Sequence, residues 1–416
     1  MSAETAGDFR KFWAGQTISN LGSTLTVFAL PLLVFKLTGS PVNLGATTAA
    51  YFLPYLLFGL AIGAWVDRVD RKRLMIGVDL GRALVIGSIP GLAAVDLLSV
   101  PWIYAATFAS ATLTIAFDAG EFAALPSLVG RDDLVSANGR IMASYQGAQV
   151  AGPLLAGALV GGGASIENVL AVDAGSFVLS ALSLAAIRTS FNAEEPRPQA
   201  SIRRDVAEGL RYVLAHPVLR NISLMMAVVN FVGSTTYAQL VLFAKERLGA
   251  SDSRVGLLFS AGSLGIVAFG LAAGRIRRHL RFSTAALGGL MLSGVATGAM
   301  AAMTSYWPAL PLWALSTGAG LFFNINTQSL RQAIAPSELL GRVVSIASVL
   351  AWSAIPLGTL LGGWVIDVTD DVAAVYGAIG ALTFLIAFAF RFTALGHAEE
   401  HLPESGAEGE PERALA

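Results

Sequence analysis

Long apolar runs, separated by short polar segments, follow one another along almost the whole chain. Each run holds about 20 residues or more, and about 20 residues rising 1.5 Å each cross the hydrocarbon core of a bilayer. The pattern therefore predicts an all-α integral membrane protein with twelve transmembrane helices. The expected spans lie at roughly 12–37, 43–66, 74–96, 101–124, 140–163, 167–188, 219–244, 254–275, 283–304, 307–329, 343–366 and 373–393.

The composition agrees with a membrane protein and excludes several other classes. Hydrophobic residues make up 55% of the 416 residues and charged residues 13%, whereas soluble domains carry about 25% charged residues. A net charge of −1 gives no overall field that would attract nucleic acid. The chain has no cysteine, which excludes disulfides and thiolate metal sites, and its first 13 residues lack the pattern of a secretory signal peptide.

Lysine and arginine divide unevenly between the two sides of the predicted bundle. An even number of spans places both termini on one side, and the termini and loops of that side hold 22 of the 27 basic residues. The opposite loops hold four, and Arg82 lies within a span. Because cytoplasmic loops are enriched in Lys and Arg, we expect both termini in the cytoplasm and the protein in the inner (plasma) membrane.

Short matches about 210 residues apart indicate that the chain contains a duplication. The segment "GAWVDRVDRKR" begins at Gly63 and "GLAAGRIRRHL" begins at Gly270, an offset of 207, while "SNLGSTLT" is matched by "NFVGSTTY" at an offset of 211. An even number of spans in each half gives the two halves the same orientation, which is a parallel repeat. We expect an N-terminal six-helix bundle at 1–188 and a C-terminal one at 219–393.

Two polar segments, 189–218 and 394–416, lie outside the predicted bundles. In the first, apolar residues at helical spacing from Ile202 to Leu214, with arginines between them, predict an amphipathic helix in the cytoplasmic membrane interface. The second is expected to be a disordered cytoplasmic tail. Its "HAEEH" at 397–401 matches a zinc-protease pattern, which we reject because the tail is short, rich in helix breakers and offers no fold to position a third ligand.

The segment between spans 2 and 3 holds the densest charge cluster of the chain and follows the pattern G-x-x-x-D-R-x-x-R-K-R. With twelve spans as six plus six, this pattern resembles the major facilitator superfamily over about residues 8–393. Two more segments, "LPSLVGRDDLVSANG" and "EGLRYVLAHPVLR", resemble the branch that holds bacterial macrolide-efflux and siderophore-export proteins. The resemblance implies the major facilitator fold and secondary active transport. The matching motif residues are Gly63, Asp67, Arg68, Arg71 and Arg73.

This charge cluster has two interpretations. The basic residues could serve only to set the topology, but acidic residues contribute little to topology and Asp67 is then unexplained. A carboxylate is stabilised by the N-terminus of another helix by about 0.3–1 kcal/mol, and by roughly 2 when partly buried. The resemblance implies that Asp67 meets the start of span 11, near Gly341–Val343, and acts as a latch between the two halves at the cytoplasmic side. Gly63 would allow the close approach of the helices.

Span 5 carries a second motif, "GAQVAGPLLAG", which resembles a motif associated with antiporters of the superfamily. Its small residues give a face on which helices can pack closely and slide, and its proline bends the span. The alternatives are a mobile gate and the ordinary small-residue packing of membrane bundles. The motif residues are Gly147, Gly152, Pro153 and Gly157.

Ionisable residues inside spans are costly and indicate function. Asp79 and Arg82, three residues apart on one face of span 3, are expected to form an inter-helix or mutual ion pair. Asp118 lies deep in span 4 with no Lys or Arg in its own span, so it is a candidate proton carrier or substrate counter-charge. A structural hydrogen-bonded role and exposure to water stay open for Asp118. Glu121 and Asp173 are further candidates for proton coupling or substrate binding.

Neutral polar residues in three spans indicate a cavity between the repeats. Such a midplane cavity, lined by amides, hydroxyls and rings, suits a bulky amphipathic organic molecule. For each of these side chains the alternative is an inter-helix hydrogen bond, worth about 0.6 kcal/mol. The candidates are Gln16, Asn20, Asn230, Ser234, Tyr237, Asn324 and Gln328.

The sequence as a whole predicts a proton-coupled exporter of small amphipathic organic compounds such as drugs, macrolides or siderophores. Enzymatic ATP hydrolysis is not expected, because a P-loop needs Gly-Lys-Ser/Thr and none of the four lysines follows a glycine. We expect no metal or other cofactor and no nucleic acid. The expected partners are the substrate, protons and the lipid bilayer, and the expected state is a monomer. The alternatives are an importer or facilitator of the same fold and a non-transporting membrane receptor or assembly partner.

Overall fold

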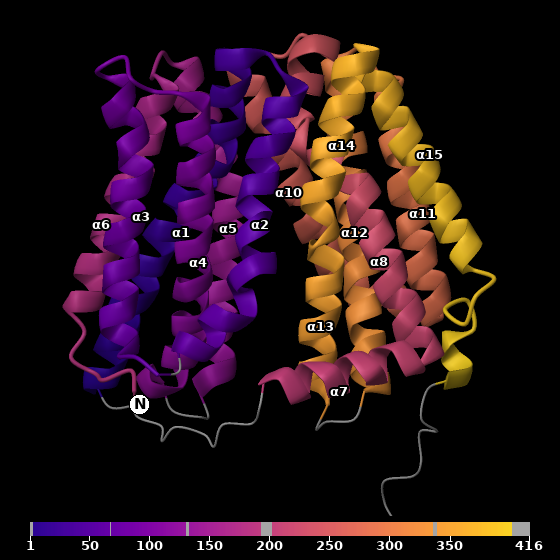
Figure 1. Ribbon diagram of the computed structural model, residues 1–416, viewed down its shortest axis with the longest axis horizontal. Helices are drawn as coiled ribbons and strands as arrows, with labels where there is room; N and C mark the ends of the chain where they lie inside the picture. The colour runs from indigo at the N-terminus through magenta and orange to yellow at the C-terminus, as the bar shows by residue number, and fades with distance from the viewer. Residues whose placement is uncertain (1–2, 67, 130–132, 193–201, 336–338, 402–416) are drawn as a thin grey trace, which may run out of the picture.

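The computed structural model describes residues 3–66, 68–129, 133–192, 202–335 and 339–401, and these ranges are almost entirely helical (Figure 1). The first six helices are α1 (Ala3–Thr38), α2 (Pro41–Val66), α3 (Arg71–Ala93), α4 (Val100–Leu128), α5 (Leu134–Gly161) and α6 (Ile166–Ala185). They are followed by α7 (Ile202–Ala215), α8 (Pro217–Ala238), α9 (Leu240–Leu242), the π-helical η2 (Phe243–Arg247), α10 (Asp252–Arg277), α11 (Phe282–Ala301), α12 (Tyr306–Ile334), α13 (Leu340–Trp352), α14 (Ala354–Thr369), α15 (Val372–Phe390) and the short η3 (Ala398–His401).

Twelve membrane spans can be assigned within the described residues. Nine helical segments are both long and apolar enough to cross a bilayer, and α2, α5 and α12 have sufficient length at 26, 28 and 29 residues. One of the nine, Val349–Thr369, runs through α13 and α14. Pro356 explains the break between these two helices, because it has no backbone N–H to donate to the carbonyl of Trp352. The predicted all-α membrane fold is confirmed.

Several helices begin where a short polar side chain caps their free N–H groups. The Asp70 carboxylate accepts a hydrogen bond from the Arg73 N–H at 2.9 Å at the start of α3. Asp371 does the same for α15, where it accepts from the Ala374 N–H at 2.9 Å. These polar residues therefore fix the points at which the chain enters the helices.

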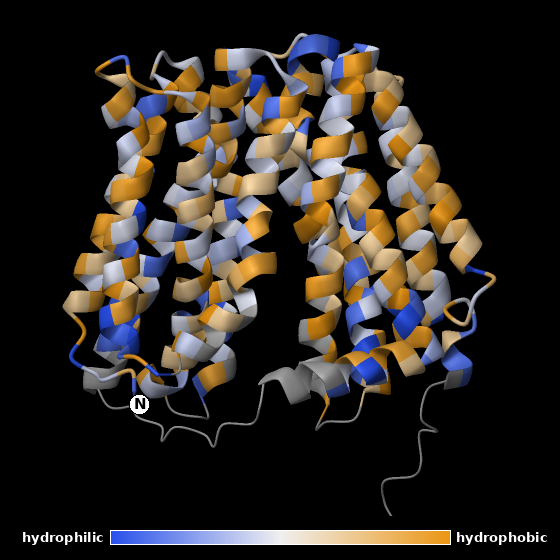
Figure 2. Cartoon of the chain, viewed as in Figure 1, coloured by the Kyte–Doolittle hydropathy of each residue, from blue (hydrophilic) through white to orange (hydrophobic). Residues whose placement is uncertain are grey.

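The helices form two bundles that stand side by side in Figure 1: α1–α6, and α8 with α10–α15. The start of α1 and all of α7 lie at one end, at the bottom of the view, which we call the terminal end; the opposite end is the far end. Figure 2 shows hydrophobic residues over most of the length of the helices and more hydrophilic residues toward the two ends. This distribution is that of a chain whose central band faces lipid.

The two bundles share one hydrophobic core at the far end. A single cluster of buried residues includes Phe28 of α1 and Phe259 of α10, whose rings meet edge to face at 6.0 Å. At the terminal end the buried residues instead form separate clusters, one around Phe12 in the first bundle and one around Ile222 in the second. The halves are thus joined at the far end and packed independently near the terminal end.

Polar contacts across the far end reinforce this junction. Gln239 donates from its side chain to the Pro41 carbonyl at 2.7 Å, and Lys36 at the end of α1 pairs with Asp252 at the start of α10 at 2.6 Å. Asp252 also pairs with Lys245 of η2. One carboxylate therefore holds cations from both halves together.

The beginning of the C-terminal tail, residues 394–401, packs against the second bundle, a contact that the sequence did not predict. Leu395 and Ala398 are fully buried in the cluster of the second bundle. The Glu399 carboxylate accepts hydrogen bonds from the N–H of Ser283, at 3.0 Å, and from its hydroxyl. The polar composition of the tail concealed these two apolar anchors and a carboxylate that caps α11. Residues 402–416 lie outside the described residues.

Candidate functional site

A cavity of about 440 Å³ opens inside the first bundle. Helices α1–α6 supply almost all of its walls, and Tyr237 of α8 closes it from the second bundle. Its volume falls within the range of about 300–1,000 Å³ that is usual for small-molecule sites. Residues that carry its polar character include Gln16, Asn20, Asp118, Glu121, Tyr145 and Gln149.

Two carboxylates of α4 face this cavity. The Asp118 side chain is exposed to it and makes no hydrogen bond or ion pair with any described residue. Glu121 lies nearly one turn closer to the terminal end and is half-buried, and its Oε1 is buried without a hydrogen-bond partner among the described residues. Both groups sit on one helical face, because residues three apart are neighbours on a helix.

The basic residue of the cavity wall is Arg82, and its charge is already compensated. Its guanidinium pairs with Asp79, three residues earlier on α3, and both side chains are buried, at 5% and 0% exposure. The same guanidinium lies over the rings of Phe117, at 4.2 Å, and Phe177, at 4.5 Å. The spacing in the sequence predicted this contact, and the structure places the pair in the wall next to α4 and α6.

Asp173 of α6 lies deeper, with 1% of its surface exposed. It accepts hydrogen bonds from the Thr26 hydroxyl of α1 and from the Ser176 hydroxyl at 3.2 Å. On the same pair of helices, Gln16 donates to the Ser180 hydroxyl at 3.2 Å. These polar contacts join α1 to α6, so Asp173 has a structural environment that Asp118 lacks.

Of the seven lining residues expected from the two halves, three line the cavity, two from the first bundle and one from the second. Gln16, Asn20 and Tyr237 line the cavity. The structure places the other four candidates outside this lining, since Asn230 donates instead to the Ala351 carbonyl at 2.9 Å and Ser234 to the Phe231 carbonyl at 3.3 Å. The remaining two are Asn324 and Gln328 of α12.

Asn230 and Ser234 of the second bundle thus donate to backbone carbonyls, whereas Asn20 of the first bundle lines the open space. A polar side chain in a span can do either, and its residue type alone does not decide between them. The tyrosines Tyr51, Tyr55 and Tyr145 also line the cavity and were missed. Their sequence signal was a hydroxyl within an apolar run, since a buried tyrosine O–H usually requires a polar partner.

The residues of the span 2–3 motif are partly outside the described residues. This holds for Asp67 and for the surroundings of Gly63, so the latch stays a prediction. Arg71 donates to the carbonyls of Ala123, at 3.1 Å, and Phe191, at 3.2 Å, which ties the start of α3 to α4 and to the segment after α6. Arg68 and Arg73 are exposed at the terminal end.

The glycines of the antiporter-like motif on α5 allow two close helix crossings. A side chain at Gly152 would collide with Thr24 of α1, and one at Gly157 would stand 3.1 Å from the Gly256 Cα of α10. The carbonyl of Pro153 also lies against Gly256. Gly147, by contrast, faces open space. The motif therefore brings α5 against both its own bundle and the opposite one.

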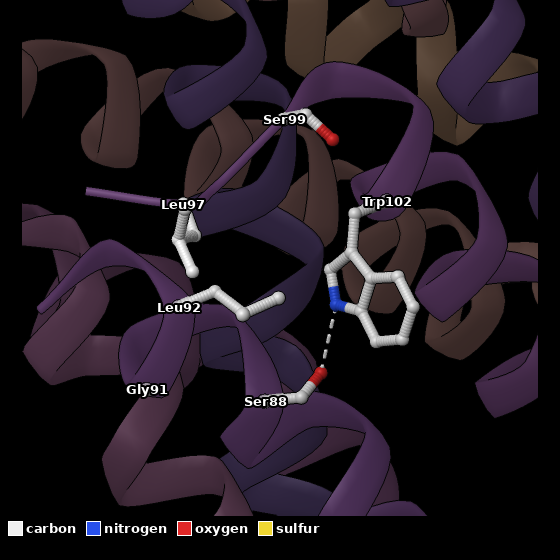
Figure 3. A pocket seen from close by; sticks show the side chains of 6 residues that line it. All are labelled: Ser88, Gly91, Leu92, Leu97, Ser99 and Trp102. Atoms are coloured by element: carbon white, nitrogen blue, oxygen red, sulfur yellow. Dashed lines mark hydrogen bonds between the residues drawn. The ribbon is translucent and has the colours of Figure 1, made fainter. Parts of the chain in front are cut away.

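A second pocket, of about 490 Å³, lies at the far end between α3 and α4 (Figure 3). The Trp102 indole N–H donates to the Ser88 hydroxyl at 3.0 Å, drawn as the dashed line, and Leu92 and Leu97 supply apolar walls. The pocket is wide open and has no ionisable group among its lining residues. The cavity around Asp118 is therefore the stronger candidate.

Comparisons of the sequence with known proteins identify related transporters. A family model of the Major Facilitator Superfamily matches residues 12–280 and 223–415. The chain is 29% identical to the multidrug efflux pump Tap of Mycolicibacterium fortuitum, over 83% of this chain and 86% of that protein. It is 26% identical to the enterobactin exporter EntS of Escherichia coli O1:K1, over 92% of this chain and 87% of that protein.

Solved transporter structures have the same fold. A bacterial homologue of the human lysosomal transporter Spinster, in an inward-facing conformation, superposes with a TM-score of 0.75 at 16% identity and covers 97% of this chain and 100% of its own. A bacterial homologue of the iron transporter ferroportin, in an inward-facing state, gives 0.73 at 16% identity, covering 94% of this chain and 100% of its own. The chain belongs to the major facilitator superfamily and is a multi-pass membrane transporter, not an enzyme.

Proposed function

We propose that this protein exports small amphipathic organic compounds across the plasma membrane in exchange for protons. The similarity to a multidrug efflux pump and to an enterobactin exporter supports export. The excess of Lys and Arg at the terminal end supports a cytoplasmic location for both termini. With that orientation, the separately packed terminal end faces the cytoplasm and the shared core faces outward, the arrangement in which an exporter takes up its cargo.

The observation that carries the proposal is the pair of carboxylates facing a cavity of ligand size. Asp118 is exposed in the cavity and has no described partner, so it is free to bind either a proton or a substrate. Exchange follows if the two compete: substrate entry from the cytoplasm displaces the proton, and proton entry from outside displaces the substrate. Asp173, which is held by two hydroxyls, is the alternative proton carrier.

Export further requires that the two bundles rock about their shared contacts. Opening to the outside must break the pair that Asp252 makes with Lys36 across the two bundles, whereas the pair between Asp252 and Lys245 lies within the second half. Closing the cytoplasmic side would bring α2 toward α13, where the proposed Asp67 latch would act. The close crossing of α5 and α10 at Gly157 and Gly256 gives these helices a small-residue surface on which to move.

Two assays test the proposal. An efflux-deficient bacterial host expressing the protein is challenged with a panel of cationic, neutral and anionic toxic compounds, with Asp118→Asn and Asp367→Asn variants at matched membrane abundance. Asp367 lies on α14 close to the far end of the molecule, is exposed, and does not line the cavity. We expect tolerance to at least one compound with the wild type and Asp367→Asn, and its loss with Asp118→Asn.

Direction is then tested with that compound in membrane vesicles. Inverted vesicles with an imposed proton gradient should accumulate it, and right-side-out vesicles should not. Uptake only by right-side-out vesicles would indicate an importer. Unchanged tolerance to every compound, with no gradient-dependent uptake in either orientation, would contradict the proposed export of amphipathic compounds.

A further inference from the structure

We propose that the cavity selects organic cations, that is, compounds with one positive charge on an aromatic or bulky alkyl body. This inference deepens the proposed function and rests on the same cavity being the transport site. The sequence and the relatives left the charge of the cargo open. The charges and rings of the cavity wall determine it.

The charge balance of the wall is negative. Among the described lining residues, the ionisable acids are Asp118, Glu121 and Asp173, and the cation is Arg82. The Arg82 charge is matched by Asp79, which lies behind it and is fully buried, and it is covered by two phenyl rings. An anionic ligand therefore finds no free positive charge in this wall, whereas a cationic ligand finds an unpartnered carboxylate at Asp118.

Aromatic side chains line the same cavity as the carboxylates. On α2, the rings of Tyr51, Phe52 and Tyr55 lie within 6.5 Å of one another, and Tyr51 and Tyr55 line the cavity together with Phe52. Tyr145 of α5 and Tyr237 of α8 are exposed within it. The faces of such rings carry negative electrostatic potential and bind organic cations, quaternary ammonium groups included. Rings and carboxylates in this cavity thus favour the same sign of ligand charge.

Glu121 gives the cation a second point of attachment. Its Oε1 is buried and makes no hydrogen bond with a described residue, so the carboxylate is not held by the protein on that side. It stands nearly one turn from Asp118 on the side of the terminal end. A cation entering from that end would meet Glu121 first and Asp118 next. At each position a carboxylate and tyrosine rings would replace part of the water around the cation.

The test uses two probes that differ chiefly in the sign of their charge. Tetraphenylphosphonium and tetraphenylborate have nearly the same size and shape, so hydrophobic burial is matched between them. Purified protein in detergent is titrated by scintillation proximity with radiolabelled tetraphenylphosphonium and, in a separate experiment, with radiolabelled tetraphenylborate, because the two ions would pair with each other in a mixture. A neutral amphiphile serves as the competitor. The full chain is used as wild type, Asp118→Asn, Glu121→Gln and the control Asp367→Asn.

We expect saturable binding of tetraphenylphosphonium to the wild type and to Asp367→Asn, and much weaker binding of tetraphenylborate. Asp118→Asn should weaken binding by about tenfold or more, since it removes the facing charge, and Glu121→Gln by a smaller factor. Acidification should also release the probe, because protons and the cation share the carboxylate.

Three results of the binding assay would overturn the inference. One is binding of tetraphenylborate as tight as that of tetraphenylphosphonium. Another is the absence of saturable tetraphenylphosphonium binding, and the third is full affinity in a folded Asp118→Asn protein. The comparison of the two probes on the wild type decides the question even if Asp118→Asn does not fold. Export of an anionic or neutral compound in the vesicle assay would leave the proposed function standing while excluding cation selection.

Discussion

Replacing Arg82 with methionine tests whether the buried pair on α3 holds the cavity wall together. The change keeps an unbranched side chain but removes the charge, which leaves Asp79 fully buried without its partner. Breaking a buried pair in this way costs about 3–5 kcal/mol. Loss of the two ring contacts at 4.2 and 4.5 Å adds about 0.5–2 kcal/mol each. We expect Arg82→Met to be destabilised by at least about 4 kcal/mol.

The double variant Asp79→Leu/Arg82→Met separates the pair from its individual charges. Removing both charges leaves no unpaired buried group, so most of the lost stability should return. Arg275→Met serves as the control, because Arg275 is exposed in the last turn of α10.

The assay is thermal unfolding of the purified proteins in detergent, followed by intrinsic fluorescence. The apparent melting temperature should fall by about 5 °C or more for Arg82→Met and recover in the double variant. A melting temperature of Arg82→Met equal to that of Arg275→Met would refute this reasoning, as would a double variant no more stable than Arg82→Met.

Three further predictions concern the helix crossing, the tail and the latch. Gly256→Val would place its side chain against the carbonyl of Pro153, so it should destabilise the α5–α10 junction by about 1–3 kcal/mol in melting assays and reduce transport in vesicles. Gly147→Val, at an open position, should change neither stability nor transport. Burial raises the pKa of Glu399, but hydrogen bonds from Ser283 outweigh this effect and lower the pKa below its ordinary 4.5. Docking of the tail should therefore hold above about pH 4.5 and weaken as the pH falls further. Hydrogen exchange of residues 394–401 measures this docking, and its pH dependence should be lost in Glu399→Gln. Asp67→Asn should insert normally and lose most transport, while Asp70→Asn should be mild; equal transport rates in vesicles would exclude the latch.

The membrane fold could be predicted from the sequence because bilayer thickness fixes the length of each span. Twelve apolar runs gave the twelve spans, and the charges of the loops gave one consistent orientation to expect. The points at which a span breaks were harder to predict, because a proline can either interrupt a helix or lie within it. Pro356 divides one span into α13 and α14, while Pro153 and Pro311 lie within unbroken helices.

The candidate site was only partly predictable. The carboxylate at Asp118 and the amides of α1 do face the cavity, but Asn230 of the second bundle donates to a backbone carbonyl across a helix contact. A single sequence indicates that a polar group in a span needs a hydrogen-bond partner, but it does not indicate which group is that partner. Leu395 was missed for a similar reason, since one buried apolar side chain in a polar tail leaves no periodic pattern.

Proton movement upon substrate addition tests the central claim most directly. Wild type, Asp118→Asn, Glu121→Gln and Asp367→Asn are reconstituted into proteoliposomes with a pH-sensitive dye, and a compound that the wild type exports is added. We predict rapid proton flux for the wild type and Asp367→Asn, a partial loss for Glu121→Gln and none for Asp118→Asn, because its amide keeps the shape of the side chain but cannot titrate. Full proton flux from a correctly folded Asp118→Asn protein would contradict the account and leave Asp173 as the next candidate carrier.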